Sequence, residues 1–190
     1  MSKGLDADTV LTDYAGCIVA AGFEFVGRYY KNLLPEEAQH LSQQGLYILS
    51  IYETNPTEYA YFSQAQGTHD AQRALQYAQG LNQPHGSSIA FTVDYDASPE
   101  EASGSITDYF RAIHSLVYPT YEVMAYANGT TLDALLNAGV IERTWLPGAT
   151  GWSGSADFQN ADIVQSNGHT VCGVGVDLDT STGDSGGWKL

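Results

Sequence analysis

The stretch Ile89-Ala-Phe-Thr-Val-Asp-Tyr-Asp96 places five mostly apolar, β-favouring residues directly before two aspartates spaced i and i+2. Side chains alternate along a strand, so Asp94 and Asp96 are expected on one face and Tyr95 on the other. The rise of a strand would separate the attachment points of the two acids by roughly 6.6 Å. A buried strand that ends in two acids and leads into Ala-Ser-Pro-Glu-Glu, a helix opening, indicates the active-site edge of an α/β protein.

Strands and helices alternate on both sides of this stretch. Further strands are predicted at 4–6, 23–30, 46–52, 121–126, 142–145, 162–165 and 172–177. Helical patterns separate most of them, which favours a parallel sheet. Eight strands predict a (β/α)8 barrel, and a length below the usual ~200 residues is explained by shortened or missing helices in the last units. The alternative, a doubly wound open sheet, lacks a G-x-G-x-x-G motif after its first strand.

Length and composition predict one globular domain. We expect the barrel domain to occupy residues 1–180, followed by a flexible Ser/Gly-rich tail at 181–190. No run reaches the ~20 apolar residues that a membrane helix needs. The N-terminus lacks an apolar h-region, so no signal peptide is predicted. The chain is then expected to stay in the cytoplasm or to be exported by another route, unless a leader has been removed.

The chain carries 22 acidic and only 7 basic residues, a formal net charge of −15. Nucleic acid and anionic membrane surfaces are disfavoured as partners, because their recognition relies on clustered Lys and Arg. A neutral or mixed-charge polymer, such as a polysaccharide, remains compatible with this charge. The two cysteines, Cys17 and Cys172, are too few for a disulfide scaffold, and we expect buried, reduced thiols. The absence of CxxC and HExxH motifs predicts neither a metal nor a cofactor.

Acids recur at the ends of the predicted strands: Asp6, Glu53, Asp94, Asp96, Asp177 and, less directly, Asp179. In a (β/α)8 barrel these ends face one shared pocket. Close carboxylates raise one another's pKa, which suits a neutral general acid beside an ionised partner. Glycoside hydrolysis needs such a pair. Taken singly, any of these acids could instead be a helix cap or a turn residue.

Aromatic residues form the second pattern at the strand ends. Tyr and Trp side chains can stack on the apolar faces of sugar rings. Arg28 lies within an aromatic strand, and a buried arginine needs a carboxylate, so we expect it to pair with a strand-end acid. The predicted substrate-binding residues are Tyr29, Arg28, Glu53, Tyr126, Trp145 and Trp152.

With these residues placed, the chain resembles a bacterial glycoside-hydrolase-like family, once classed as a domain of unknown function. That family is remote kin to the family 25 lysozymes, which are N-acetylmuramidases. The matching segments span nearly the whole chain in order: Gly4-Leu-Asp6, Phe25-Val-Gly-Arg-Tyr-Tyr30, Ile89 to Asp96, Ala125-Tyr-Ala-Asn-Gly129, Trp145-Leu, Ala161-Asp-Ile-Val-Gln165 and Gly175-Val-Asp-Leu-Asp179.

The resemblance implies a barrel with irregular final units and a site that faces peptidoglycan glycan strands. Asp6 and Asp177 match acids in the first and last strands of the lysozymes, and Asp94 matches the first acid of their Asp-x-Glu motif. Asp96 stands where the lysozymes carry the glutamate taken as general acid. Its carboxyl would sit roughly 1–1.5 Å further back, a displacement that can cost ~100-fold in rate.

These observations predict a peptidoglycan-directed, muramidase-like hydrolase that cleaves β-1,4 bonds. Asp96 is the expected general acid, and Asp94 is expected to stabilise the oxocarbenium charge or to orient the N-acetyl group. Asp6 and Asp177 would shape the electrostatics. The alternative is a non-catalytic cell-wall glycan-binding module on the same barrel. Peptidoglycan or a related polysaccharide is the expected partner, and a secretion apparatus or an immunity protein is a further candidate.

Overall fold

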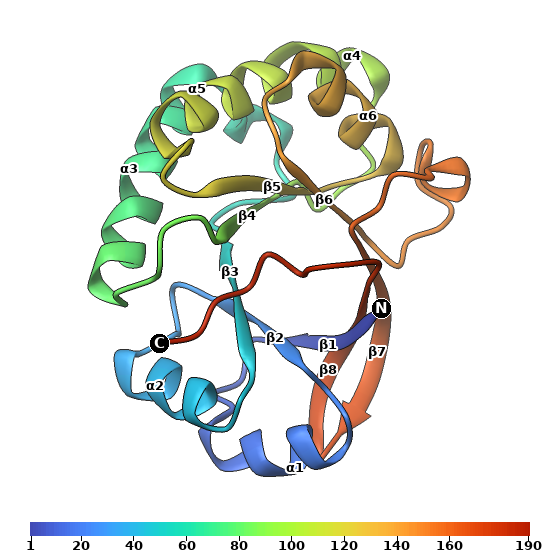
Figure 1. The fold of residues 1–190 in the computed structure, drawn as a ribbon. Helices are drawn as coiled ribbons and strands as arrows, with labels where there is room; N and C mark the ends of the chain where they lie inside the picture. The colour runs from blue at the N-terminus through green and yellow to red at the C-terminus, as the bar shows by residue number, and fades with distance from the viewer.

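Eight strands close into a single barrel in chain order in the computed structural model, which describes residues 1–190 (Figure 1). The predicted barrel is therefore confirmed. The strands are β1 (Ser2–Ala7), β2 (Phe25–Tyr29), β3 (Tyr47–Tyr52), β4 (Ser88–Thr92), β5 (Glu122–Tyr126), β6 (Arg143–Leu146), β7 (Ile163–Val171) and β8 (Val174–Ser181).

Helices cover only part of the barrel. They are α1 (Ala15–Ala20), α2 (Pro35–Gln43), α3 (Gln64–Gly80), α4 (Pro99–Glu101), α5 (Thr107–Val117) and α6 (Gly129–Ala138), with a π-helical segment η3 (Ala102–Ile106) between α4 and α5. Short 3-10 turns are η1 (Thr12–Tyr14), η2 (Tyr59–Tyr61) and η4 (Ser155–Asp157). Only η4 lies between β6 and β7, and a hairpin joins β7 to β8. The last units have thus lost their helices, as predicted.

The eighth strand runs against the others, so the expectation of an all-parallel sheet was wrong for β8. It pairs antiparallel with both β7 and β1, whereas β1 to β7 pair in parallel. Cys172 and Gly173 form the turn before β8 with positive φ angles of 55° and 84°. Two residues with φ > 0 suit a tight hairpin, and a two-residue connection can join only antiparallel strands.

The core has two layers separated by the barrel wall. Apolar side chains that face outward from the strands pack against the helices in a cluster of 40 buried residues. A smaller cluster fills the barrel interior and consists of Phe25, Leu49, Ile51, Ala90, Met124, Trp145 and Ile163. Central strands buried on both faces explain the nearly continuous apolar runs in the sequence. The interior cluster supports the polar residues at the carboxyl end of the barrel.

The C-terminal segment packs against the barrel, which contradicts the expectation of a flexible tail. Trp188 is only 2% exposed. Its backbone exchanges hydrogen bonds with Ile48 of β3 at 2.8 and 2.9 Å, and its indole N–H donates to Ser50 Oγ at 2.9 Å. In Figure 1 this red segment crosses in front of the strands toward the C-terminus. Burial of the indole ring holds the Ser/Gly-rich segment in place despite its composition.

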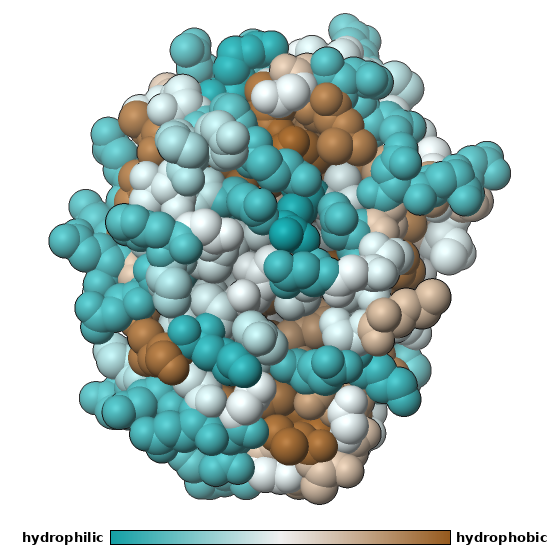
Figure 2. All heavy atoms as spheres, in the orientation of Figure 1, coloured by the Kyte–Doolittle hydropathy of each residue, from teal (hydrophilic) through white to brown (hydrophobic).

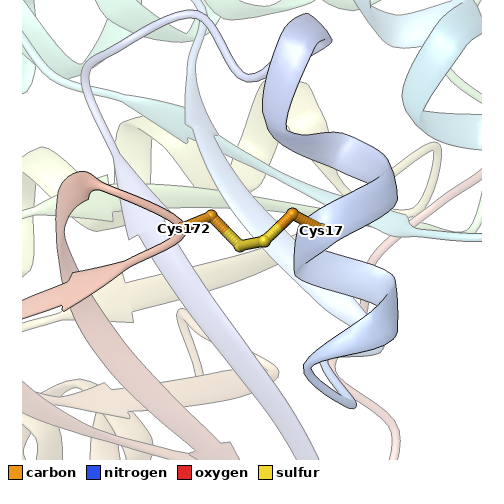
Figure 3. Close-up of a disulfide and its surroundings, with 2 residues drawn as sticks. All are labelled: Cys17 and Cys172. Carbon is orange, nitrogen blue, oxygen red and sulfur yellow. A yellow bond between two sulfur atoms is a disulfide. The ribbon is translucent and has the colours of Figure 1, made fainter.

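A disulfide joins Cys17 of α1 to Cys172 at the β7–β8 turn (Figure 3). The expectation of reduced, buried thiols was therefore wrong. The two residues are 155 positions apart in the sequence, but their Cα atoms lie 6.1 Å apart. Closure of the barrel brings the hairpin beside α1, a proximity that cysteine spacing does not reveal.

Reduction of this disulfide is expected to lower the free energy of unfolding by about 3 kcal/mol, the middle of the range usually measured for native disulfides. The cross-link closes a long loop and so restricts the unfolded chain. Urea denaturation with and without reductant measures the effect, and a Cys17→Ser, Cys172→Ser double variant should reproduce it. Equal stability of the oxidised and reduced protein would contradict the prediction.

No helix has the length and apolar character needed to cross a bilayer. Figure 2 shows apolar residues on one face as separate small patches among hydrophilic ones. Scattered apolar residues of this kind are normal on a folded domain.

Candidate active site

A cavity of about 140 Å³ opens at the carboxyl ends of the barrel strands. Four carboxylates line it, and none of its lining residues is cationic. The full lining consists of Asp6, Tyr29, Ile51, Glu53, Thr92, Asp94, Tyr126, Trp145, Gln165, Asn167 and Asp177. Polar groups from β1 to β5 and from the β7–β8 hairpin thus converge on one apolar-floored pocket, as is usual for barrel active sites.

The four carboxylates that line the cavity occupy different positions relative to their strands. Asp6 projects from β1 directly opposite Asp177 of β8 in the antiparallel ladder. Glu53 follows the last residue of β3, and Asp94 lies two residues beyond the end of β4. Asp177 lies within its strand, because β8 runs in the reverse direction. A strand-end position therefore explains Glu53 and Asp94 but does not explain Asp177.

Asp96 lies outside this cavity, contrary to the expectation that it shares a face with Asp94. The strand ends at Thr92, and the chain then turns, so the alternation of side chains stops before Asp96. Asp96 is exposed, and its Oδ1 accepts hydrogen bonds from the Ser153 N–H at 2.7 Å and from Asn128 Nδ2 at 2.9 Å. Its carboxylate ties the loop after β6 to the N-terminus of α6.

A chain of hydrogen bonds links the cavity walls. The Tyr126 hydroxyl donates to Gln165 Oε1 at 2.8 Å, and Gln165 Nε2 donates to Asp6 Oδ2 at 2.7 Å. Gln165 and Asn167 were not predicted as site residues. Alternation from the apolar Ile163 could have found Gln165, because residues two apart in a strand share a face.

Asp179, the last of the acids noted at the predicted strand ends, does not line the cavity and lies buried below its floor. It is 2% exposed, and its Oδ1 accepts the Trp145 indole N–H at 3.0 Å. Its register partner across the ladder is Gly4, and the next interior residue of β1 is Asp6. The Asp179 Oδ2 atom is buried and has no hydrogen-bond partner, and the neighbouring charge of Asp6 acts on this carboxyl. Two neighbouring buried carboxyls disfavour the state in which both are ionised, because the two charges would repel.

Burial and neighbouring charges raise the pKa of the acids in this network. Desolvation is the main cause for Asp6, which is 5% exposed, and it raises the pKa of that carboxyl to about 7. Burial also raises the pKa of Asp179 well above its ordinary range. The pKa of Asp94 is raised by burial and then by the charge of Asp177. Burial raises the pKa of Glu53 as well, against the opposing effect of Lys31.

Arg28 does not contact the cavity or any strand-end acid, so its predicted pairing was wrong. Tyr29 faces the cavity, and alternation turns Arg28 outward toward α2. There the fully buried guanidinium donates from Nε to Glu37 Oε1 at 3.0 Å and from Nη2 to Glu37 Oε2 at 3.2 Å. Its Nη1 donates to the Ala7 carbonyl. This ion pair fastens α2 to the ends of β1 and β2.

Three of the four predicted aromatic residues line the cavity, and one does not. Tyr29, Tyr126 and Trp145 contribute to its wall and floor. The rings of Tyr126 and Trp145 meet edge to face, with centroids 5.3 Å apart. Trp152 lies in the loop between β6 and η4 and is not among the lining residues. Its expected contact with substrate therefore has no support in the geometry.

The cavity is the centre of a longer depression. A hollow of about 370 Å³ shares Asp6, Tyr29 and Asp177 with it. A second, of about 410 Å³, shares Gln165 and Asn167, and a third, of about 220 Å³, shares Glu53. These adjoining hollows would accommodate units on either side of a group held in the cavity. The shape suits part of a polymer better than an isolated small molecule.

Known proteins are similar to this chain in sequence, in fold or in both. The Bacillus subtilis protein FadG is 27% identical over 173 residues, which cover 82% of this chain. The match covers only 30% of FadG, so the chain spans less than a third of this relative. The Tat-secreted protein Rv2525c of Mycobacterium tuberculosis is 27% identical to this chain in sequence. Its crystal structure in complex with HEPES matches the fold with a TM-score of 0.86. That alignment covers 98% of both chains.

A more distant structure shares the fold alone. The modular autolysin LytC of Streptococcus pneumoniae, in complex with a synthetic peptidoglycan ligand, is 14% identical with a TM-score of 0.60. The alignment covers 94% of this chain and 46% of LytC. Family membership follows from the sequence itself, in agreement with the resemblance described above. The family model matches residues 16–181, and the chain belongs to the Rv2525c-like, glycoside hydrolase-like domain family.

Proposed function

We propose that this domain is a glycoside hydrolase that cleaves β-1,4 bonds in a peptidoglycan-type glycan. The observation that carries the proposal is the convergence of four carboxylates and three aromatic side chains on one cavity. Paired carboxyl groups of different protonation state are what glycoside hydrolysis requires. The glycoside-hydrolase-like family and the peptidoglycan ligand of the LytC structure support this choice of reaction and substrate.

In this proposal, the general acid is Asp6 rather than Asp96. With a pKa of about 7, Asp6 is largely protonated in mildly acidic solution and can give its proton to the leaving glycosidic oxygen. Asp94 is less buried and would act as the ionised partner that stabilises the oxocarbenium charge. As the C–O bond breaks, water adds to the anomeric carbon, and its proton passes to a cavity carboxylate. Asp177 would shape the electrostatics, and Tyr29 and Trp145 would hold the sugar ring.

Digestion of purified cell-wall sacculi tests this function. Mass spectrometry of the released fragments should show new reducing ends on N-acetylmuramic acid. Digestion in H₂¹⁸O should add one heavy oxygen to each new end, because hydrolysis takes that oxygen from water. Intact sacculi after prolonged incubation with folded protein would contradict the proposed activity.

A second candidate is a non-catalytic glycan-binding module. The position of Asp96 favours it, because the counterpart of the lysozyme general acid is occupied by hydrogen bonds to Asn128 and Ser153 outside the cavity. Sedimentation with sacculi separates the two functions. Binding without the release of reducing ends would support the module, and release of reducing ends would support the enzyme.

A further inference from the structure

Arg73 is an unusual cation in this strongly acidic chain. The other arginines, Arg28, Arg111 and Arg143, each pair with at least one carboxylate. Arg73 has no carboxylate within ion-pair distance. Its Nη1 donates to Gln76 Oε1 at 3.2 Å, and its guanidinium lies 5.5 Å from the centroid of the Tyr77 ring. Most of its hydrogen-bonding capacity is therefore free.

This guanidinium borders the 220 Å³ hollow that adjoins the acidic cavity. The charged and aromatic residues that line the hollow include Lys31, Glu53, His69, Asp70, Arg73 and Tyr77, and we call it the basic hollow. Two of the chain's seven Lys and Arg residues thus meet at one depression. Glu53 belongs to the linings of both the acidic cavity and the basic hollow, so one ligand could occupy both.

The acids of the basic hollow are already engaged. Lys31 Nζ lies 3.7 Å from Glu53 Oε1 and 4.8 Å from the centroid of the Tyr29 ring, at the boundary with the cavity. Asp70 is fully buried and accepts the hydroxyls of Tyr52, Tyr61 and Tyr109 at 3.0, 2.6 and 2.8 Å. These bonds hold its carboxylate in the floor and stabilise its charge. Arg73 is left as the cation of the hollow that has no ion-pair partner.

The floor of the basic hollow is also rigid enough to orient a ligand. The rings of Tyr30 and Tyr77 stack with centroids 5.4 Å apart and an interplanar angle of 13°. Arg73 lies over one of these rings, which restricts its side chain. A guanidinium held in this way presents a planar set of donors that matches a carboxylate.

We propose that the basic hollow binds a carboxylate carried by a glycan whose sugar ring occupies the acidic cavity. The inference rests on the proposed function and adds a preference for sugars that bear a carboxylate substituent over neutral ones. Four carboxylates in the cavity would repel such a substituent, whereas Arg73 and Lys31 line the adjoining hollow that shares Glu53 with the cavity. Charge therefore sets the orientation of the glycan.

Isothermal titration calorimetry with two probes tests this preference. One probe is a neutral tetramer of N-acetylglucosamine, and the other is a tetrasaccharide of the same length that contains N-acetylmuramic acid with free lactyl carboxylates. Arg73→Gln is expected to weaken binding of the second probe by about five- to tenfold, the range for a partly exposed charged contact. Binding of the neutral probe should not change. The matched control is Arg111→Gln, an exposed arginine on α5 that should affect neither probe.

The possible outcomes separate this inference from the proposed function. Equal affinity of the unaltered protein for both probes, or equal effects of Arg73→Gln on both, would overturn the basic hollow as a carboxylate site while leaving the glycan site intact. Failure of the unaltered protein to bind either probe would overturn both. The inference would be supported if Arg73→Gln lost affinity only for the carboxylate-bearing probe and if added salt made this loss smaller.

Discussion

Replacement of Asp6 by Asn is expected to lower the rate of sacculus hydrolysis by at least about 100-fold, the usual contribution of a general acid. The amide keeps the size of the side chain and can still accept the hydrogen bond from Gln165 Nε2, but it has no proton to give to a leaving oxygen. Asp94→Asn should cause a similar loss, since the neutral amide cannot stabilise a developing positive charge. The initial rate of appearance of new reducing ends measures both effects.

Two further variants make this result interpretable. Asp108→Asn carries the same chemical change on the exposed surface of α5, where Asp108 pairs only with Arg111, and should retain full activity. Asp96→Asn should stay within about tenfold of the unaltered protein, a loss no larger than a surface hydrogen bond explains. If Asp96→Asn lost activity while Asp6→Asn kept a normal rate, the general acid would be Asp96 and not Asp6.

The buried acids should make the folded domain less stable as the pH rises. An unfolded aspartate has a pKa of about 3.9, whereas that of folded Asp6 is about 7. Between these values the folded state holds a proton that the unfolded state has lost. The contribution of Asp6 to stability is therefore fully present below about pH 4 and is lost as the pH rises through 7. Three pKa units correspond to a loss on the order of 4 kcal/mol. The raised pKa of Asp179 acts in the same direction.

Urea denaturation at pH 5 and pH 8 measures this dependence. Asp6→Asn removes the buried charge, so it should flatten the pH dependence and be more stable than the unaltered protein at pH 8. Asp108→Asn should follow the unaltered protein at both values. An Asp6→Asn variant whose stability declines with pH as steeply as that of the unaltered protein would show that Asp6 is not the titrating group. A gain in stability combined with a loss of activity would also show that the activity is not lost through unfolding.

The barrel could be predicted because its evidence is local. Apolar strands such as 89–92 alternate with amphipathic helices, and this order alone favours a closed sheet of βα units. The direction of β8 could not be predicted from the same pattern. It depends on the Cys172-Gly173 turn, whose two positive φ angles reverse the chain. The disulfide to Cys17 depends in turn on that reversal.

In the candidate site, too, residues whose position depends on the local sequence were predicted correctly, and residues whose position depends on the tertiary structure were not. Glu53 and Asp94 follow their strands closely, so a position near the strand ends was enough to predict their place at the cavity. Asp96 was misplaced because alternation was extended past Thr92, where the chain has already left the sheet. Arg28 was misplaced because the partner of a buried arginine can lie on either side of the barrel wall, and its partner is Glu37 of α2.

By itself, the sequence determined a barrel of βα units, its family and an edge rich in acids and aromatic residues, because periodicity and motifs depend on neighbours along the chain. The tertiary structure decided which acids meet. It turned Asp96 out of the cavity, placed Asp179 near Asp6 and put Arg73 in a hollow that Glu53 also lines. These arrangements involve residues from distant parts of the chain, and only the closed barrel brings them together. The same closure buries Asp6 and Asp179, and burial is the main cause of their raised pKa values.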